Sequence, residues 1–195
     1  MKIRVLSLAL LALGATAAQA NLINNGSFED VNLGGGSWSQ FNSLNGGWYA
    51  IADKIEVGHA DVYGVTAQDG QNVLELDANN NATVAQDLSL SAGTYSLSFL
   101  FAKRAGTSDA TNQIDVLWNG TQVGSYSPTS TEFSLANLNL TGVNGVNTLA
   151  FRGAGVSDSY GSMVDKVSVQ AVPEPATMAA LGAGALGLLR RRRKA

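Results

Sequence analysis

The sequence predicts an all-β domain, a single sandwich of the jelly-roll type, and three observations support this. Residues 94–102 alternate apolar and small polar side chains with a period of two, which is typical of a half-buried strand. Similar short runs follow one another along the chain, separated by glycine, asparagine and serine. Between these runs no longer window has the periodicity of an amphipathic helix.

The predicted strands share β-branched, aromatic and leucine residues at alternating positions. They cover residues 72–77, 82–90, 94–102, 113–118, 131–140, 147–152 and 163–172. One hairpin can be assigned, because Asn119 and Gly120 suit the two positive-φ positions of a type I′ turn. The strand that contains Trp118 is therefore expected to pair with the strand that contains Val123.

The chain has no cysteine, so its fold depends on a packed core without disulfides. A domain of about 150 residues buries roughly two thirds of the surface that its unfolded chain exposes. We therefore expect residues 21–172 to form one domain that is stable by its core.

Residues 1–20 have the features of a secretory signal. Lys2 and Arg4 precede an apolar run over residues 5–13, and Ala18-Gln19-Ala20 forms a small-x-small cleavage site. The apolar run is about half of the roughly 20 residues needed to span a bilayer as a helix. We expect export and removal of this segment.

The segment between the signal and the C-terminal region is strongly acidic. From Asn21 to Pro175 there are 15 acidic and five basic residues, which gives a net charge of about −10. Nucleic-acid binding requires neutralisation of phosphates by basic side chains, so this class of partner is excluded. Cations and neutral polymers are compatible with this charge.

Residues 173–195 form a distinct C-terminal segment. Pro173 and Pro175 cannot continue a strand, and the following residues 176–189 carry no charge. As a helix these residues would reach about 21 Å, short of the roughly 30 Å hydrocarbon core of a bilayer. The basic residues that follow, Arg190, Arg191, Arg192, Arg193 and Lys194, would stay on the cytoplasmic side. We expect a short membrane helix that holds the chain only transiently.

Several short motifs resemble those of the galactose-binding-like β-sandwich family, which includes many carbohydrate-binding modules. They are NLINNGSFED, Gly47-Trp48, DGQNVLELD, VAQDLSLSAGTYSLSF and MVDKVSV, and they span residues 21–172. The resemblance implies a structural calcium ion, with Glu29 and Asp165 at the matching positions. Two carboxylates and several backbone carbonyls would satisfy Ca²⁺, which takes six to eight oxygen ligands. The alternative is that Glu29 caps a turn and Asp165 is a solvated strand residue.

The C-terminal segment closely resembles the PEP-CTERM sorting signal. Val172, Pro173, Glu174 and Pro175 match its most specific element, followed by the apolar run and the arginine cluster. The resemblance implies a Gram-negative host, and processing near the motif by an exosortase after transient anchoring in the inner membrane. The mature protein would then reach the cell surface or the extracellular matrix. The alternatives are an ordinary tail anchor and a buried amphipathic helix.

Catalysis is the weaker hypothesis. The chain has a single histidine, His59, no cysteine nucleophile, and no GxSxG, HExxH or P-loop motif. A pair of carboxylates would suffice for a glycoside hydrolase, but no pair is distinguished by its spacing. We therefore predict no catalytic residue.

Sugar binding needs only one or two exposed rings with polar neighbours. Trp38, Tyr63 and Tyr160 lie in glycine-rich segments typical of loops and are the candidate sugar-binding residues. For each of them the alternative is a ring that covers one end of the sandwich.

Three functional hypotheses remain from the sequence. The first is a non-catalytic surface or matrix protein that binds a glycan, such as the exopolysaccharide of its own cell. The second is a structural biofilm or matrix component without a sugar ligand. The third and least favoured is a secreted glycoside hydrolase.

Overall fold

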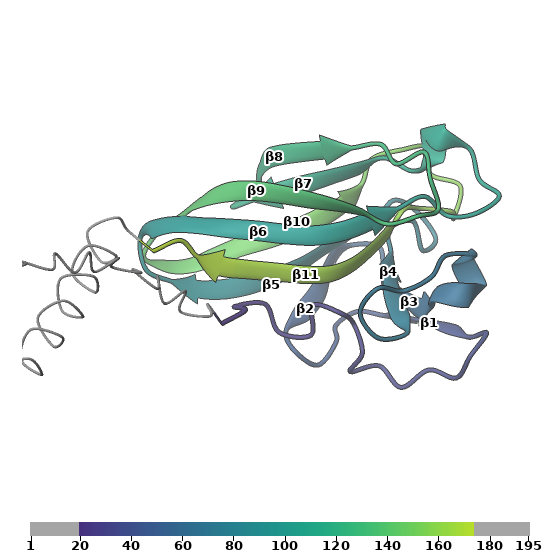
Figure 1. Cartoon of the computed structure of the whole chain (residues 1–195), viewed down its shortest axis with the longest axis horizontal. Helices are drawn as coiled ribbons and strands as arrows, with labels where there is room; N and C mark the ends of the chain where they lie inside the picture. The colour runs from purple at the N-terminus through teal and green to yellow at the C-terminus, as the bar shows by residue number, and fades with distance from the viewer. Residues whose placement is uncertain (1–19, 174–195) are drawn as a thin grey trace, which may run out of the picture. The chain divides into compact units, whose positions relative to one another are not determined.

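Eleven strands in two antiparallel sheets make up the described part of the chain, residues 20–173 of a computed structural model (Figure 1). This confirms the predicted all-β sandwich. The strands are β1 (Trp38–Phe41), β2 (Trp48–Ala52), β3 (Ile55–His59), β4 (Asn72–Glu75), β5 (Thr83–Leu90), β6 (Gly93–Ala102), β7 (Ile114–Trp118), β8 (Thr121–Tyr126), β9 (Ser134–Gly142), β10 (Gly145–Gly153) and β11 (Met163–Ala171). Two short 3₁₀ helices lie between strands: η1 (Ala60–Tyr63) follows β3 and η2 (Asp109–Thr111) precedes β7.

The strand order shows that the two sheets are interleaved along the chain. The larger sheet has the order β1-β3-β4-β11-β6-β9 and the smaller one β2-β5-β10-β7-β8. The last strand, β11, pairs with both β4 and β6 and is therefore an inner strand of the larger sheet. The C-terminal end of the domain is thus held by hydrogen bonds to strands from its middle.

The predicted hairpin is confirmed between β7 and β8. Asn119 and Gly120 have φ angles of 51° and 79°, and Trp118 lies opposite Thr121. Only residues that tolerate positive φ can connect two strands through so short a turn.

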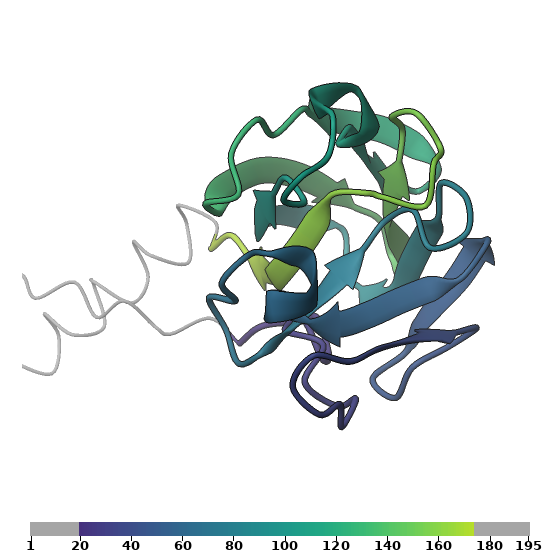
Figure 2. The same cartoon turned by 90° about the vertical axis from the view of Figure 1, so that its right-hand side faces the viewer.

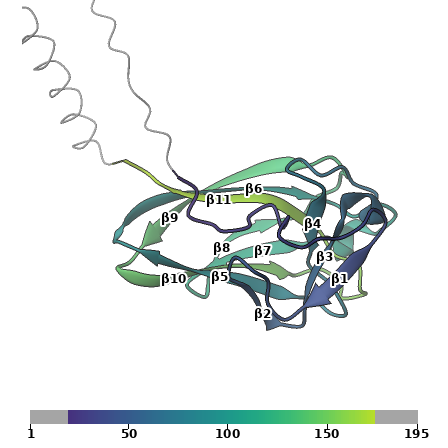
Figure 3. The ribbon, with the colours of Figure 1, turned by 90° about the horizontal axis from the view of Figure 1, so that it is seen from below.

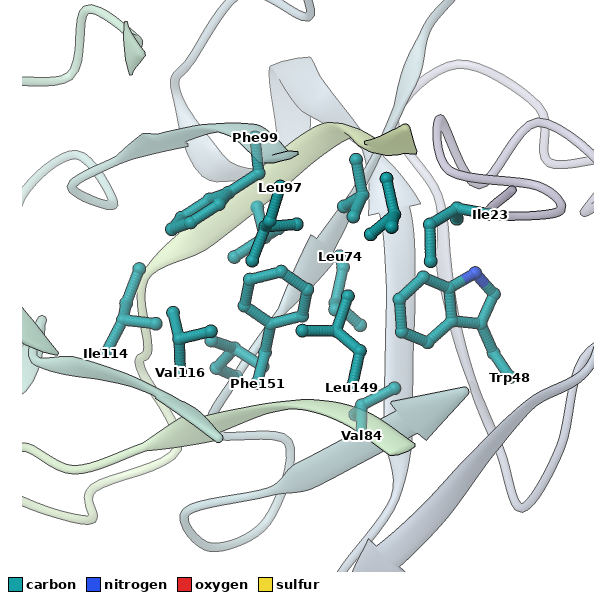
Figure 4. Packing of buried hydrophobic residues seen from close by; sticks show 14 of the residues in the cluster. Ile23, Trp48, Leu74, Val84, Leu97, Phe99, Ile114, Val116, Leu149 and Phe151 are labelled. Carbon is teal, nitrogen blue, oxygen red and sulfur yellow. The ribbon is translucent and has the colours of Figure 1, made fainter. Parts of the chain in front are cut away.

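The main core lies between the sheets, where the inward-facing residues of both meet (Figure 4). Phe151 of β10 is in edge contact with Phe99 of β6, with ring centroids 4.9 Å apart. Trp48 is fully buried beside Phe151, and its indole N–H donates to the carbonyl of Asn25 at 3.0 Å. The core therefore joins the two sheets and also fixes the N-terminal segment.

A second, smaller cluster lies on the outer face of the larger sheet. It contains Ala60 and Tyr63 of η1 together with Val65, Val73, Ala102 and Met163. Tyr63 lies against Gly58 of β3, where a Cβ atom would overlap the Tyr63 ring. Figure 2 looks onto one end of the sandwich and shows η1 and the neighbouring loops gathered there.

The N-terminal segment runs beside β11 (Figure 3). Leu22 N–H donates to the carbonyl of Val169 at 2.8 Å, and Val167 N–H donates to that of Gly26 at 2.8 Å. The Asn21 amide bonds Val167 and Val169 as well. Residues Ala20–Val172 therefore form one compact unit whose two ends lie together.

Candidate functional site

The two predicted calcium residues hold one loop from two sides. Glu29 Oε1 accepts hydrogen bonds from the backbone N–H groups of Gln71 at 2.8 Å and Asn72 at 2.6 Å. Asp165 Oδ2 accepts from the N–H groups of Gln68 at 3.0 Å and Asp69 at 3.2 Å. The structure thus brings Glu29 and Asp165 to the same loop, residues 68–72, although they are far apart in sequence.

A bulge in β11 directs Asp165 toward this loop. The register between β11 and β6 shifts between Asp165 and Ser168, and Lys166 has a φ angle of 51°. Asp165 Oδ1 accepts from the Lys166 N–H at 2.6 Å, which holds the carboxylate in place. The bulge is a local feature that the alternating pattern of this strand does not reveal.

Asp165 is a buried carboxylate without a basic partner in the part of the chain that the structure describes. The pKa of Asp165 is raised to about 6, mainly by burial and to a smaller extent by the charge of Asp69, against the lowering by three backbone N–H donors. A buried negative charge of this kind is stabilised by a cation.

Glu29 and Asp165 fit a Ca²⁺ site only if backbone carbonyls of the loop 68–72 supply further ligands. Within residues 20–173 no group of three or more acidic, histidine or cysteine side chains is arranged to hold a metal ion. Glu29 and Asp165 supply two carboxylates, so the remaining oxygens would come from carbonyls of the adjoining loop. Calcium therefore stays a prediction.

The three predicted sugar-binding residues lie on the outer face of the larger sheet or at its edge. Trp38 is in β1, opposite Gly58, and the residue is 51% exposed. Tyr160 lies in the loop before β11 and is 48% exposed. Tyr63 lies in η1 and is only 1% exposed. The Tyr63 ring covers Gly58 and has no open face. Tyr63 is therefore not placed to stack on a sugar.

Arg104 connects two of these residues, and the sequence did not identify it. Its Cζ atom lies 5.0 Å from the ring centroid of Tyr63 and 4.5 Å from that of Tyr160. A guanidinium near two aromatic rings is held by cation–π attraction. Tyr63, Arg104 and Tyr160 come from three separate segments of the chain, so no local sequence pattern could predict that they lie together.

Two buried carboxylates lie behind Arg104. Glu56 of β3 and Glu75 of β4 are directly opposite each other in the sheet, and Arg104 Nη1 is 3.6 Å from Glu75 Oε1. The Tyr63 hydroxyl donates to Glu56 Oε1 at 3.1 Å, and Gln40 Nε2 donates to Glu56 Oε2 at 3.0 Å. These contacts link Tyr63 and Arg104 to a polar network under the outer face.

The backbone completes the hydrogen bonding of Glu75. The N–H of Asp77 donates to its Oε2 at 2.7 Å, and the N–H of Gly161 donates to its Oε1. The pKa of Glu75 is raised to about 7, mainly by burial and also by the negative Glu56, against the lowering by these N–H donors and by Arg104. Burial likewise raises the pKa of Glu56. The pair therefore binds a proton near neutral pH.

Glu56 and Glu75 are 5% and 0% exposed. A carboxylate must reach the glycosidic oxygen or the anomeric carbon to act in glycoside hydrolysis. In this closed position the pair can anchor Arg104 and the loop around Tyr160, but it does not meet a substrate.

A groove of about 510 Å³ lies elsewhere, beside β1, and none of the predicted site residues lines it. Its lining combines apolar and uncharged polar side chains with one acid: Asp30, Val31, Asn32, Leu33, Ser39, Phe41, Ser43, Leu44 and Asn45.

The C-terminal residues 171–194 match the family model of the PEP-CTERM protein-sorting motif. The predicted residues Glu174, Pro175 and Arg190 to Arg193, the short helix and the signal at 1–20 lie largely outside the described residues. Val172 and Pro173 are described and follow β11 directly. Within residues 20–173 no helix has the length and hydropathy of a membrane span.

Two curated proteins are similar in sequence to most of the chain. A multifunctional-autoprocessing repeats-in-toxin of Vibrio cholerae serotype O1 (strain ATCC 39315 / El Tor Inaba N16961) is 40% identical over 151 residues, 75% of this chain. The protein of the same name from Vibrio vulnificus is 36% identical over 150 residues, also 75% of this chain. In both cases the match spans only 3% of the relative's length.

Solved structures of other proteins are similar to this chain at low sequence identity. An arabinose-bound MgGH51 α-L-arabinofuranosidase is 16% identical with a TM-score of 0.53, over 78% of this chain and 26% of that one. A family 35 carbohydrate-binding module from Paenibacillus barcinonensis is 17% identical with a TM-score of 0.45, over 70% and 99%. At such identity the likeness concerns the β-sandwich fold alone.

Proposed function

We propose that this chain is an exported cell-surface or matrix protein whose sandwich binds a glycan without catalysis, through Tyr160, Arg104 and Trp38. The observation that carries the proposal is the half-exposed Tyr160 ring held beside the Arg104 guanidinium. A sugar offers an apolar CH face that packs on such a ring, and hydroxyls that accept from a guanidinium. Trp38 adds a second half-exposed ring on the edge strand of the same sheet.

The buried network supports this role because it fixes the ring before a ligand arrives. Glu75 contacts Arg104 and also accepts from the N–H of Gly161, the residue after Tyr160. Asp77 accepts from the N–H groups of Asp158 at 2.7 Å and Ser159 at 2.9 Å. A loop held by its backbone loses less conformational freedom on binding.

The test compares matched aromatic substitutions on the two sheets. Binding to a panel of soluble polysaccharides, including the exopolysaccharide of the host, would be measured by affinity electrophoresis and calorimetry. Tyr160→Ala and Trp38→Ala are expected to weaken binding about tenfold, which corresponds to about 1.4 kcal/mol. Tyr49→Ala removes a ring from the outer face of the smaller sheet and should leave the affinity unchanged.

If Tyr49→Ala abolishes binding and Tyr160→Ala does not, the glycan site lies on the other sheet. If the folded wild-type protein binds no polysaccharide of the panel, the second hypothesis, a structural matrix component, is favoured.

We further propose that an exosortase processes the chain near the Val172–Pro175 sequence after transient anchoring in the inner membrane of a Gram-negative host. The match to the sorting motif over residues 171–194 supports this. The intact mass of the native protein should equal that of a chain without the arginine cluster. A mature mass that is the same with Glu174→Ala as with the wild type would contradict a role for this glutamate.

We also propose structural calcium at Glu29 and Asp165. The buried Asp165 without a basic partner supports it. Calcium at a hundred times its dissociation constant would add about 2.7 kcal/mol of stability, and so raise the melting temperature by about 5–10 °C. Glu29→Gln should remove most of this shift, whereas a matched change at an exposed carboxylate, Asp109→Asn, should not. A melting temperature that is equal with calcium and with chelator would count against the site.

A further inference from the structure

Strand β9 is a long sheet edge without the usual protection against pairing. It pairs with β6 over nine consecutive residues with no register shift, and no other described strand pairs with its outer side. The other edge strands are shorter or irregular: β1 has four residues, while β2 and β8 contain register shifts. Natural edges are blunted by bulges, charges or proline, and residues 134–142 contain neither a charge nor a proline.

The hydrogen-bonding direction along β9 follows from one cross-strand pair. The Thr94 carbonyl accepts from the N–H of Val172, and the carbonyl of its partner Thr141 accepts from the Trp118 indole. Both residues therefore direct their backbone groups away from the β6–β9 contact.

Because these directions alternate along a strand, Leu135, Asn137 and Asn139 also direct their N–H and C=O groups outward. Trp118 occupies the outer carbonyl at Thr141 only. The outward groups of the other three residues are free of described intramolecular partners.

The charge distribution favours a second copy as the occupant of this edge. The segment from Asn21 to Pro175 carries about −10 overall, but residues 116–151 include a single charged residue, Glu132. This segment contains both β8 and β9, which lie along the same side of the sandwich (Figure 1). Repulsion between two acidic domains is therefore smallest where this side of each faces the other.

The strand is also suited to pairing with itself. A two-fold axis requires antiparallel contact of identical segments. With Asn137 opposite Asn137 of the second copy, Leu135 lies opposite Asn139, and every outward backbone group of these residues finds a partner. The facing side chains are uncharged and include Leu135, which is 61% exposed.

We propose that two copies of this domain associate through antiparallel pairing of their β9 strands, which joins the two larger sheets into one continuous sheet. This inference does not depend on glycan binding, because β9 and β1, the strand of Trp38, are opposite edges of the larger sheet.

The test is sedimentation of the domain Ala20–Val172, a compact unit with its own core, over a range of protein concentrations. The wild type is expected to approach twice the mass of one copy at high concentration. Asn137→Pro removes one outward N–H without touching the bonds to β6, and should keep the protein at one copy. Asn137→Lys should do the same by placing like charges opposite each other, in case the proline variant does not fold.

The control is Val146→Lys, which adds the same charge at an exposed position on β10 in the smaller sheet. It should associate as the wild type does. Amide hydrogen exchange adds a direct measurement: the N–H groups of Leu135, Asn137 and Asn139 should exchange more slowly in the concentrated sample than in the dilute one.

A wild type that stays at one copy at all concentrations would overturn the proposal. So would dissociation by Val146→Lys but not by either Asn137 variant, because the contact would then lie on the smaller sheet.

Discussion

Glu75→Gln is expected to change how the stability of the domain depends on pH. The carboxyl group of Glu75 is fully buried opposite Glu56, and its pKa is raised from the ordinary value of 4.5 to about 7, mainly by burial. Between these two values the folded protein binds more protons than the unfolded chain. The free energy of unfolding therefore falls as the pH rises through this range.

The magnitude follows from the pKa difference. A change from 4.5 to about 7 corresponds to about 3 kcal/mol, lost at up to about 1.4 kcal/mol per pH unit. Glutamine has nearly the same shape and stays neutral, so the variant does not incur this loss. The stability of Glu75→Gln relative to the wild type should thus rise by about 3 kcal/mol between pH 4.5 and pH 8.

The assay is urea unfolding at a series of pH values with wild type, Glu75→Gln and the control Glu132→Gln, which removes an exposed carboxylate. The difference between variant and wild type is the informative quantity, because contributions from titrating groups that do not interact with Glu75 cancel in it. A difference for Glu75→Gln that is constant with pH, or that decreases as pH rises, would refute the reasoning. Arg104 would then hold Glu75 ionised throughout.

Three further substitutions have clear expectations. Trp48→Ala should destabilise the domain by about 3–5 kcal/mol, since it empties a fully buried site and removes the bond to Asn25; a loss below 1 kcal/mol in urea unfolding would contradict this core. Gly70→Ala should lower the melting temperature, because Gly70 has a φ angle of 85° and an added Cβ would overlap the Glu29 carboxylate; an unchanged melting temperature would contradict this. Arg104→Lys keeps the charge but loses the planar contact with Tyr160, so we expect a loss of about 1 kcal/mol in unfolding experiments, and equal stability would contradict the contact.

The sequence predicted the inner strands well because their physical signal is local. The alternation in β6 and the turn residues Asn119 and Gly120 each depend on neighbours only a few positions away, and the structure agrees with both. The predictions omitted β1, β2 and β3, which are short edge or near-edge strands. Trp38 was expected in a loop and instead begins β1. Strands of four or five residues contain too few alternations to be distinguished from loops.

The candidate site was predicted only in part because its members meet through tertiary contacts. Tyr160 was found from its glycine-rich loop, but its contact with Arg104 connects residues 56 positions apart. Tyr63 has the same local signal as Tyr160 and is buried, because η1 folds back over Gly58. A glycine-rich context therefore predicts a loop, while exposure of its aromatic residue depends on which part of the sheet lies beneath.

The direction of β11 relates the proposed glycan site to the sorting segment. This strand begins directly after the Tyr160 loop and ends next to Val172, one residue before the end of the described chain at Pro173 (Figure 1). Nine residues of strand extend about 30 Å, so Tyr160 and Val172 lie at opposite ends of the sandwich. The N-terminal residues lie beside the C-terminal half of β11, since the Leu22 N–H donates to the Val169 carbonyl. A domain attached through its C-terminus would therefore present the Tyr160 end away from the attachment point, and cleavage beyond Pro173 would leave intact the backbone hydrogen bonds among residues 20–173.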